Sequence, residues 1–149
     1  MQCRQFFIVA FLSLVAAGLV GGCAPAGGQA RLAYVAKKDA HSGVRKSALD
    51  SMTDQALIAD VAKHSKYPQT RLLAAQRLDE DHQAVAQATF AELARKNNKD
   101  TLAGTEIRRT AVHHLTDPKH LAKVAKKADD AYVRSVAVQK LAILNAQRD

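Results

Sequence analysis

Internal repetition is the feature of this sequence that most restricts its fold. A hexapeptide made of an aliphatic residue or Phe, Ala, any residue, Val or Leu, Ala, and Lys or Arg occurs four times: LAYVAK at 32–37, IADVAK at 58–63, FAELAR at 90–95 and LAKVAK at 121–126. A second pattern, in which Val, Thr or Ile precedes Arg and an Ala follows three residues later, begins at residues 44, 70, 107 and 133. The two patterns alternate, and residues 44–78 align with 107–141 without a gap, with twelve identical pairs among thirty-five. Repeats of about 20–50 residues indicate units that must stack on one another to bury a core.

Both patterns have the spacing of a helix. Val44, Ala48 and Met52 recur at i, i+4 and i+8, and Ile58 and Val61 are three residues apart, so each set lies on one helical face. The chain is rich in Ala, Leu and Val and has no Trp, whereas strands favour β-branched and aromatic residues. The sequence therefore predicts an all-α fold.

Asp residues mark the turns between the two patterns. Asp54 and Asp117 precede the hexapeptide helices, where Asp is a favoured N-cap, and Pro118 suits the first helical position. Each unit is then a helix, a turn and a second helix of about 26 residues, preceded by a lone helix at 31–40 and closed by a helix that ends near 147. The paired alanines of every hexapeptide, including Ala59 and Ala122, are predicted to lie at close contacts between stacked helices.

This arrangement of Val-Arg-x-x-Ala, Thr-Asp and the hexapeptide resembles the short HEAT-like repeats of bacterial proteins, over about residues 31–147. The resemblance implies an α-solenoid of helix-turn-helix units. Because the units are short, the related leucine-rich-variant solenoid, in which one helix of each pair is 3₁₀, stays open. HEAT-like arrays host unrelated functions, so the resemblance does not name one.

The first segment has the properties of an export signal. Arg4 and the amino terminus precede residues 6–20, which carry no charge. A positive start followed by a short apolar run is typical of a secretory signal peptide. A spanning helix needs about 20 apolar residues, so an uncleaved anchor is the alternative only if Gly21 and Gly22 are included.

The run from Leu19 to Cys23 resembles the lipobox of bacterial lipoproteins, in which small residues precede a cysteine. The resemblance implies cleavage before Cys23 and its acylation by fatty acids such as palmitate, so that membrane lipid holds the mature chain. Ala24 stands where Asp would retain such a protein in the inner membrane, which points to the outer membrane, facing the periplasm. The predicted organisation is a signal peptide at 1–22, a flexible tether at 23–30 and the repeat domain at 31–149.

One unit is longer than the others. From Arg71 to Arg108 is 37 residues, eleven more than the period, of which six precede FAELAR and five fall in a predicted loop at 97–105. Insertions in repeat arrays often mark the binding face, although length drift in a tolerant loop is the alternative. The candidate partner-binding residues are Asn97, Asn98, Lys99, Asp100, Thr101 and Leu102.

The charge balance suggests a second kind of partner. The net charge is +8, and removal of residues 1–22 with Arg4 leaves +7. Five cations end the hexapeptide helices and could align into an anion-binding stripe: Lys37, Lys63, Arg95, Lys126 and Lys127. Favourable contact with the helix dipole is the alternative explanation. Four arginines share one position of the second pattern, where a structural ladder to turn carboxylates is expected: Arg45, Arg71, Arg108 and Arg134.

No pattern indicates catalysis. The chain has no Gly-x-Ser-x-Gly and no Gly-rich phosphate loop, and the mature part has no free Cys, so no enzyme activity, cofactor or metal is predicted. His113 and His114 project about 100° apart on a helix and are expected to face solvent. We therefore expect an envelope lipoprotein that acts as a protein–protein interaction or assembly scaffold and binds no nucleic acid. The alternative is a binder of lipopolysaccharide or anionic phospholipid.

Overall fold

The computed structural model describes residues 26–96 and 101–147, which fold into α-helices joined by short turns. The described residues contain eight α-helices and one short 3₁₀ helix: α1 (Ala26–Lys38), α2 (Ser42–Asp50), α3 (Gln55–His64), α4 (Pro68–Gln76), η1 (Glu80–His82), α5 (Gln83–Arg95), α6 (Leu102–His114), α7 (Pro118–Lys127) and α8 (Ala131–Ala146). The predicted all-α class is confirmed for these residues. Each helix pair carries the hexapeptide on its odd-numbered helix and the second pattern on its even-numbered helix.

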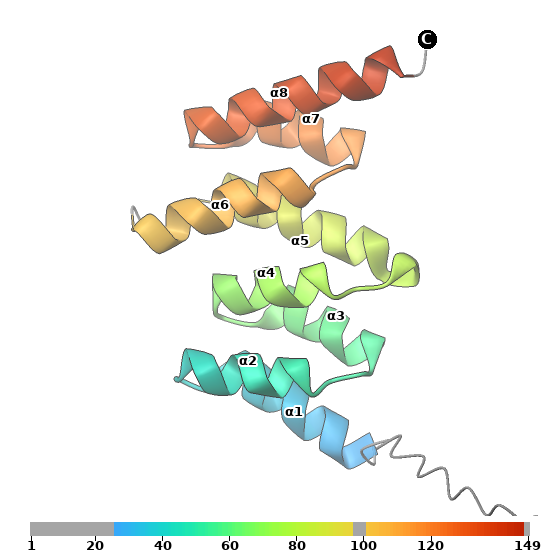
Figure 1. Cartoon of the computed structure of the whole chain (residues 1–149), viewed down its shortest axis with the longest axis vertical. Coiled ribbons are helices and arrows are strands. Elements are labelled where there is room, and N and C mark those ends of the chain that lie inside the picture. The colour runs from blue at the N-terminus through green and yellow to red at the C-terminus, as the bar shows by residue number, and fades with distance from the viewer. Residues whose placement is uncertain (1–25, 97–100, 148–149) are drawn as a thin grey trace, which may run out of the picture.

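The helices form two layers (Figure 1). One layer contains α1, α3, α5 and α7, and the other, nearer the viewer, contains α2, α4, α6 and α8. Each odd-numbered helix packs against the even-numbered helix that follows it, and each pair stacks on the next pair. The pairs α1/α2 and α7/α8 therefore lie at opposite ends of the stack.

The helix starts follow the predicted capping chemistry. The Asp54 side chain accepts a hydrogen bond from the amide of Leu57, and Asp117 accepts one from His120. Pro118 occupies the first turn of α7. Capping satisfies amides that would otherwise have no partner within the helix, so these predicted turns are confirmed.

The core runs between the two layers along the whole stack. Ile58 and Val61 of α3 and Leu49 and Val112 of the other layer are fully buried. Val44, predicted on the apolar face of its helix, is 45 % exposed because α2 belongs to the first described pair and no described helix pair precedes it. Burial at each unit thus depends on its neighbours, as a stacked array requires.

The hexapeptide alanines show the same end effect. Ala59 is buried, as are its counterparts in α1 and α5, Ala33 and Ala91. Ala122 is exposed, because no described helix stacks on the outer side of α7. The prediction of a close contact at every hexapeptide is therefore wrong for Ala122.

Two predicted boundaries are also wrong. Residues 26–30, predicted as tether, form the first turn of α1. Gln29 of this turn is 7 % exposed, and its Oε1 accepts a hydrogen bond of 3.0 Å from the amide of Thr53, so a tertiary contact orders a stretch whose glycines disfavour helix. Residues 102–105, predicted as loop, belong to α6, because Thr101 caps the helix through a 3.1 Å hydrogen bond from the Gly104 amide.

Candidate functional site

The arginines of the second repeat pattern point into the structure and fasten its turns. Arg45 is 5 % exposed, and its Nη1 donates to the carbonyls of Asp39 at 2.9 Å and Ala40 at 2.8 Å. Its Nε donates to Thr70 Oγ1 at 3.0 Å, and the guanidinium lies 3.5 Å from the ring centroid of Tyr67. Arg45 therefore connects the α1–α2 turn to the start of α4.

The other arginines have related roles with different partners. Arg134 Nη1 donates to the carbonyls of Ala128 at 2.7 Å and Asp129 at 2.8 Å, while Arg71 forms a 2.5 Å ion pair with Glu92. Arg108 Nη2 lies 3.7 Å from a carboxylate oxygen of Asp130. The predicted ladder to turn carboxylates is thus wrong for Arg45 and Arg134, which use backbone carbonyls because the preceding helix ends leave these groups without partners. It is also wrong for Arg71, because its carboxylate partner Glu92 lies within α5 and not in a turn.

Three glutamines, which sequence reasoning missed, hold successive units together. They share the position three residues before the hexapeptide: Gln29, Gln55 and Gln87. Gln87 Oε1 accepts hydrogen bonds from the amides of Thr116 at 2.8 Å and Asp117 at 3.0 Å, and the other two make the equivalent contact with their own next unit. The recurrence of Gln at one repeat position was the signal that could have revealed them.

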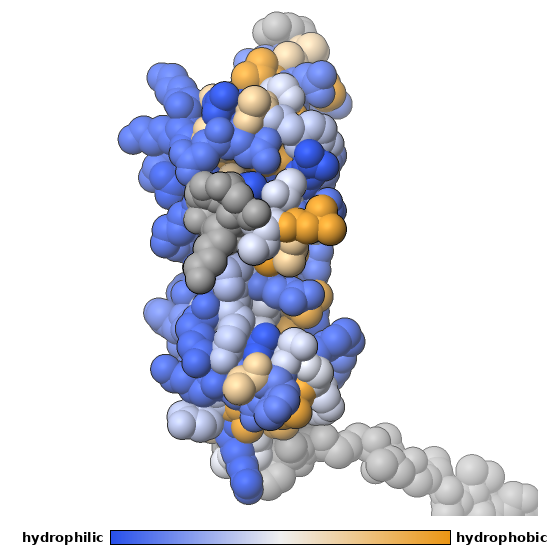
Figure 2. All heavy atoms as spheres, turned by 90° about the vertical axis from the view of Figure 1, so that its left-hand side faces the viewer, coloured by the Kyte–Doolittle hydropathy of each residue, from blue (hydrophilic) through white to orange (hydrophobic). Residues whose placement is uncertain are grey.

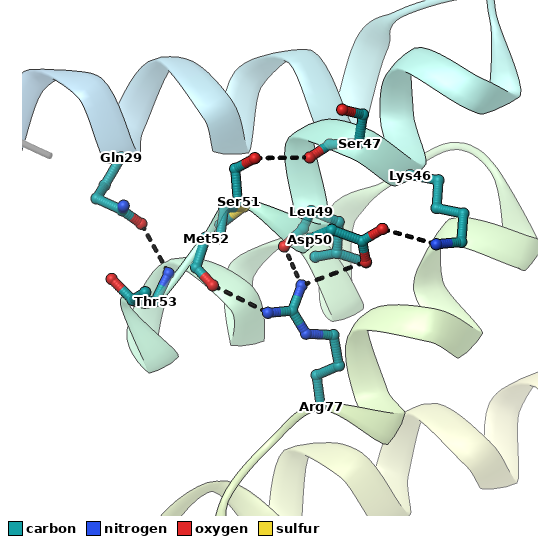
Figure 3. A network of polar contacts seen from close by, with 9 residues as sticks. All are labelled: Gln29, Lys46, Ser47, Leu49, Asp50, Ser51, Met52, Thr53 and Arg77. Atoms are coloured by element: carbon teal, nitrogen blue, oxygen red, sulfur yellow. Dashed lines mark hydrogen bonds and ion pairs between the residues drawn. The ribbon is translucent and has the colours of Figure 1, made fainter. Parts of the chain in front are cut away.

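A further contact joins successive helices of the second layer (Figure 3). Arg77 Nη2 donates to the carbonyl of Met52 at 3.0 Å, and Nη1 lies 3.8 Å from a carboxylate oxygen of Asp50. Lys140, at the same repeat position, donates to the carbonyl of His113 at 2.6 Å, and burial lowers its pKa. Both side chains cover the carboxyl end of the previous helix and are structural.

The predicted anion-binding stripe is interrupted at its first member. Lys37 Nζ forms a 2.5 Å ion pair with Asp60 Oδ2, and Asp60 Oδ1 lies 2.7 Å from His64 Nδ1. The hydrogen bond from Lys37 holds the pKa of Asp60 below its usual value. Lys37 is therefore already paired within the protein, unlike a free cation of the predicted stripe.

The other predicted cations remain at the surface. Lys63, Lys126 and Lys127 are exposed, and Arg95 lies at the end of α5. Figure 2 views the stack from the left-hand side of Figure 1: hydrophilic side chains dominate the side of this view where the odd-numbered helices lie, and apolar patches lie mainly on the side of the even-numbered helices. On the face seen in Figure 2, the two layers thus differ in surface chemistry.

A groove between α5 and α7 concentrates the positive charge. It has a volume of about 360 Å³, and we call it the α5–α7 groove, lined by Ala88, Ala91, Glu92, Arg95, Lys96, His120 and Lys123. Arg71 and Lys96 engage the two carboxylate oxygens of Glu92, and the hydrogen bond from Arg71 is the main reason that the pKa of Glu92 falls to about 2. Glu92 is therefore ionised and already paired.

The predicted partner-binding segment is described only in part. Asn97, Asn98, Lys99 and Asp100 lie outside the described residues. Thr101 is the N-cap of α6, and Leu102, the first residue of that helix, is 82 % exposed.

Leu102 immediately precedes one lining residue of a second groove. The α4–α6 groove has a volume of about 220 Å³ and is lined by Gln69, Leu72, Leu73, Ala103, Glu106, Ile107 and Thr110. Its apolar side chains come from the facing sides of α4 and α6. The combination of an exposed Leu and this groove is suited to an apolar side chain of a partner.

The two adjacent histidines face outward as expected. His114 stacks on Phe90 with ring centroids 5.3 Å apart and lies 2.8 Å from Gln76 Nε2, whereas His113 lies 3.3 Å from the Tyr132 hydroxyl. The part of the chain that the structure describes contains no group of three or more His, Cys, Asp or Glu side chains placed to hold a metal ion.

The predicted lipid attachment at Cys23 lies outside the described residues. Among the helices that the structure does describe, none has the length and apolar character needed to cross a membrane. Comparison with protein-family models, curated proteins and solved structures gives no match to this chain.

Proposed function

We propose that this protein is an exported lipoprotein, acylated at Cys23, whose helix pairs form a HEAT-like α-solenoid that binds a protein partner in the cell envelope. The lipobox-like run that ends at Cys23 supports the anchor, and Ala24 supports the outer membrane as its location. Acyl chains on the cysteine give stable attachment where a single chain would be marginal.

The stacked helix pairs support the HEAT-like assignment over the leucine-rich-variant alternative. Both helices of every described pair are α-helical, and the 3₁₀ residues within the described ranges are the single turn Glu80–His82. That turn lies in the inserted stretch before α5 rather than at a repeated position. A leucine-rich-variant array would place 3₁₀ structure in each unit.

The exposure of Leu102 beside the α4–α6 groove carries the proposal of a partner surface. An apolar side chain that is 82 % exposed gains free energy when a partner covers it, at roughly 25 cal/mol per Å² of apolar area. Leu102 also begins the helix that follows the insertion, where the array departs from its period. Binding residues concentrate at such irregular segments on rigid scaffolds.

Leu102→Asp tests this surface without weakening the helix. Asp at the first turn of a helix interacts favourably with the helix dipole, so α6 stays folded while the apolar contact is lost. The matched control is Val44→Asp, because Val44 is also a partly exposed residue in the first turn of an even-numbered helix. We expect crosslinked partner recovered from intact cells to fall about tenfold or more for Leu102→Asp, as for an apolar interface anchor, and to persist for Val44→Asp. Equal recovery by both variants would contradict the proposed surface.

A five-residue deletion of Lys99 to Ala103 is a less suitable test. The repeat period alone suggests that it would restore a regular link, but it removes Thr101 and the first two residues of α6. Loss of an N-cap costs about 0.5–2 kcal/mol, so a failure to bind would not separate lost contact from lost stability.

A further inference from the structure

Successive odd-numbered helices meet at two fixed positions of the hexapeptide. Between α1 and α3, the last residue of one hexapeptide, Lys37, forms an ion pair with the third residue of the next, Asp60, at 2.5 Å. Between α3 and α5, the same two positions hold Lys63 and Glu92, which line one groove. The first junction thus holds an ion pair, and at the second the carboxylate is present but is paired with Arg71 and Lys96.

The third junction lacks the carboxylate. Between α5 and α7, the last hexapeptide position is Arg95 and the third position of the next hexapeptide is Lys123. Both line the α5–α7 groove, and neither forms an ion pair with any described residue. Lys96 is paired with Glu92, so within the described ranges the groove keeps two positive charges, those of Arg95 and Lys123, that form no ion pair.

Helix α7 extends this positive surface. Lys119, Lys123 and Lys126 are exposed at i, i+4 and i+7, so they follow one face of the helix, and α7 contains no acidic residue. Like charges repel one another. The fold does not require a lysine at the third hexapeptide position, since α3 has Asp60 there and α5 has Glu92. A ligand with several negative charges would relieve this repulsion.

We propose that the α5–α7 groove binds a ligand with two or more phosphate groups, through Arg95 and Lys123 and with Lys119 and Lys126 beside them. The planar guanidinium of Arg95 matches two phosphate oxygens, and the lysine ammonium groups supply adjustable point charges. An anionic lipid surface and a soluble oligophosphate share this chemistry. The α5–α7 groove lies between odd-numbered helices, whereas the α4–α6 groove of the proposed partner surface lies between even-numbered helices. Failure of the phosphate-binding test would therefore leave the proposed partner surface untouched, and the reverse also holds.

Lys123→Glu is the decisive variant because it restores the carboxylate that the other junctions have. The introduced carboxylate would face Arg95 as Asp60 faces Lys37, so folding is retained and the groove loses its excess charge. Lys38→Glu makes the same change of net charge at an exposed lysine of α1 that has no ion pair with any described residue. Lys123→Gln serves as a second variant if Lys123→Glu does not fold.

The experiment uses the full chain in non-ionic detergent, with titration calorimetry against inorganic tripolyphosphate and, separately, against micelles doped with phosphatidylglycerol or with phosphatidylcholine. Acetylation of each lysine, read by mass spectrometry, locates the contact. We expect Lys119, Lys123 and Lys126, but not Lys38, to be protected from acetylation by at least one of the two probes. Protection by tripolyphosphate indicates a soluble oligophosphate as the ligand, and protection by phosphatidylglycerol indicates an anionic lipid surface. We expect binding to weaken at least about fivefold in Lys123→Glu and to stay within about twofold in Lys38→Glu. Equal weakening in both variants, or no protection by either probe, would overturn the proposal.

Discussion

Ala59 and Ala122 occupy the same position of the repeat, yet Ala59 is 5 % exposed between stacked helices and Ala122 lies at the surface. The difference arises from the neighbours and not from the residues, because α5 stacks on α3 whereas no described helix stacks on the outer side of α7. Substitutions at these two positions therefore distinguish the contribution of the repeat sequence to stability from the contribution of helix stacking.

Ala59→Leu should lower the free energy of unfolding by about 1–3 kcal/mol, because the larger side chain overpacks a close helix contact. Ala122→Leu should change it by less than about 0.5 kcal/mol, since the added atoms project into solvent. Urea unfolding followed by circular dichroism gives both values. A similar loss in both variants would show that Ala122 is covered in solution.

Gln29→Leu should destabilise the fold by about 1–3 kcal/mol. The 7 % exposed carboxamide oxygen accepts from the amide of Thr53, and its removal leaves that amide without its partner. Gln139→Leu is the control, because Gln139 is exposed on α8. Thermal unfolding of the two variants makes the comparison, and an unchanged melting temperature for Gln29→Leu would mean that water replaces the contact without cost.

Glu92 should make stability depend on pH in the acid range. Its pKa falls from 4.5 to about 2 in the folded protein, mainly through the hydrogen bond from Arg71. A carboxyl group whose pKa is lowered by folding stabilises the protein above its unfolded pKa, and that contribution is lost as pH falls from about 4.5 to about 2. Glu92→Gln should therefore be less stable than the parent at neutral pH, and the difference should shrink over this range.

Melting temperatures between neutral pH and about pH 2 test this expectation. Glu106→Gln is the control, because Glu106 is exposed and forms no ion pair within the described ranges. A constant gap between the parent and Glu92→Gln across the acid range would show that the Arg71 pairing does not favour the charged form.

Cys23→Ser should release the protein from the membrane fraction and abolish incorporation of labelled palmitate, because the proposed acylation site is the cysteine that ends the lipobox-like run. Cell fractionation with intact-mass measurement of the product provides the readout. Persistent membrane attachment with residues 1–22 still present would instead identify residues 6–22 as an uncleaved anchor.

Local sequence signals predicted the helices and turns well. Asp54, Asp117 and Pro118 mark helix starts through contacts within a few residues, so spacing alone was sufficient to place them. The start of α1 could not be predicted in this way, because Gly27 and Gly28 disfavour helix and the stabilising contact of Gln29 reaches Thr53 in the next unit.

The candidate sites depended on which repeat positions meet across units, and the sequence does not give this directly. Lys37 was assigned to a free stripe because its partner Asp60 lies on the next stacked helix. The sequence did not single out Lys123 for the same reason: its position becomes informative only when it is known to line the same groove as Arg95. The exposure of Leu102 likewise required knowing that α6 begins at this residue.

The most direct test of the proposed scaffold function is photo-crosslinking in living cells, with the crosslinking amino acid placed at position 102. The same amino acid at position 44, on the second helix of the first pair, is the control. The proposal predicts a discrete crosslinked protein at position 102, in the membrane fraction, that is absent at position 44. No adduct at position 102, or the same adducts at both positions, would contradict a partner surface beside the α4–α6 groove.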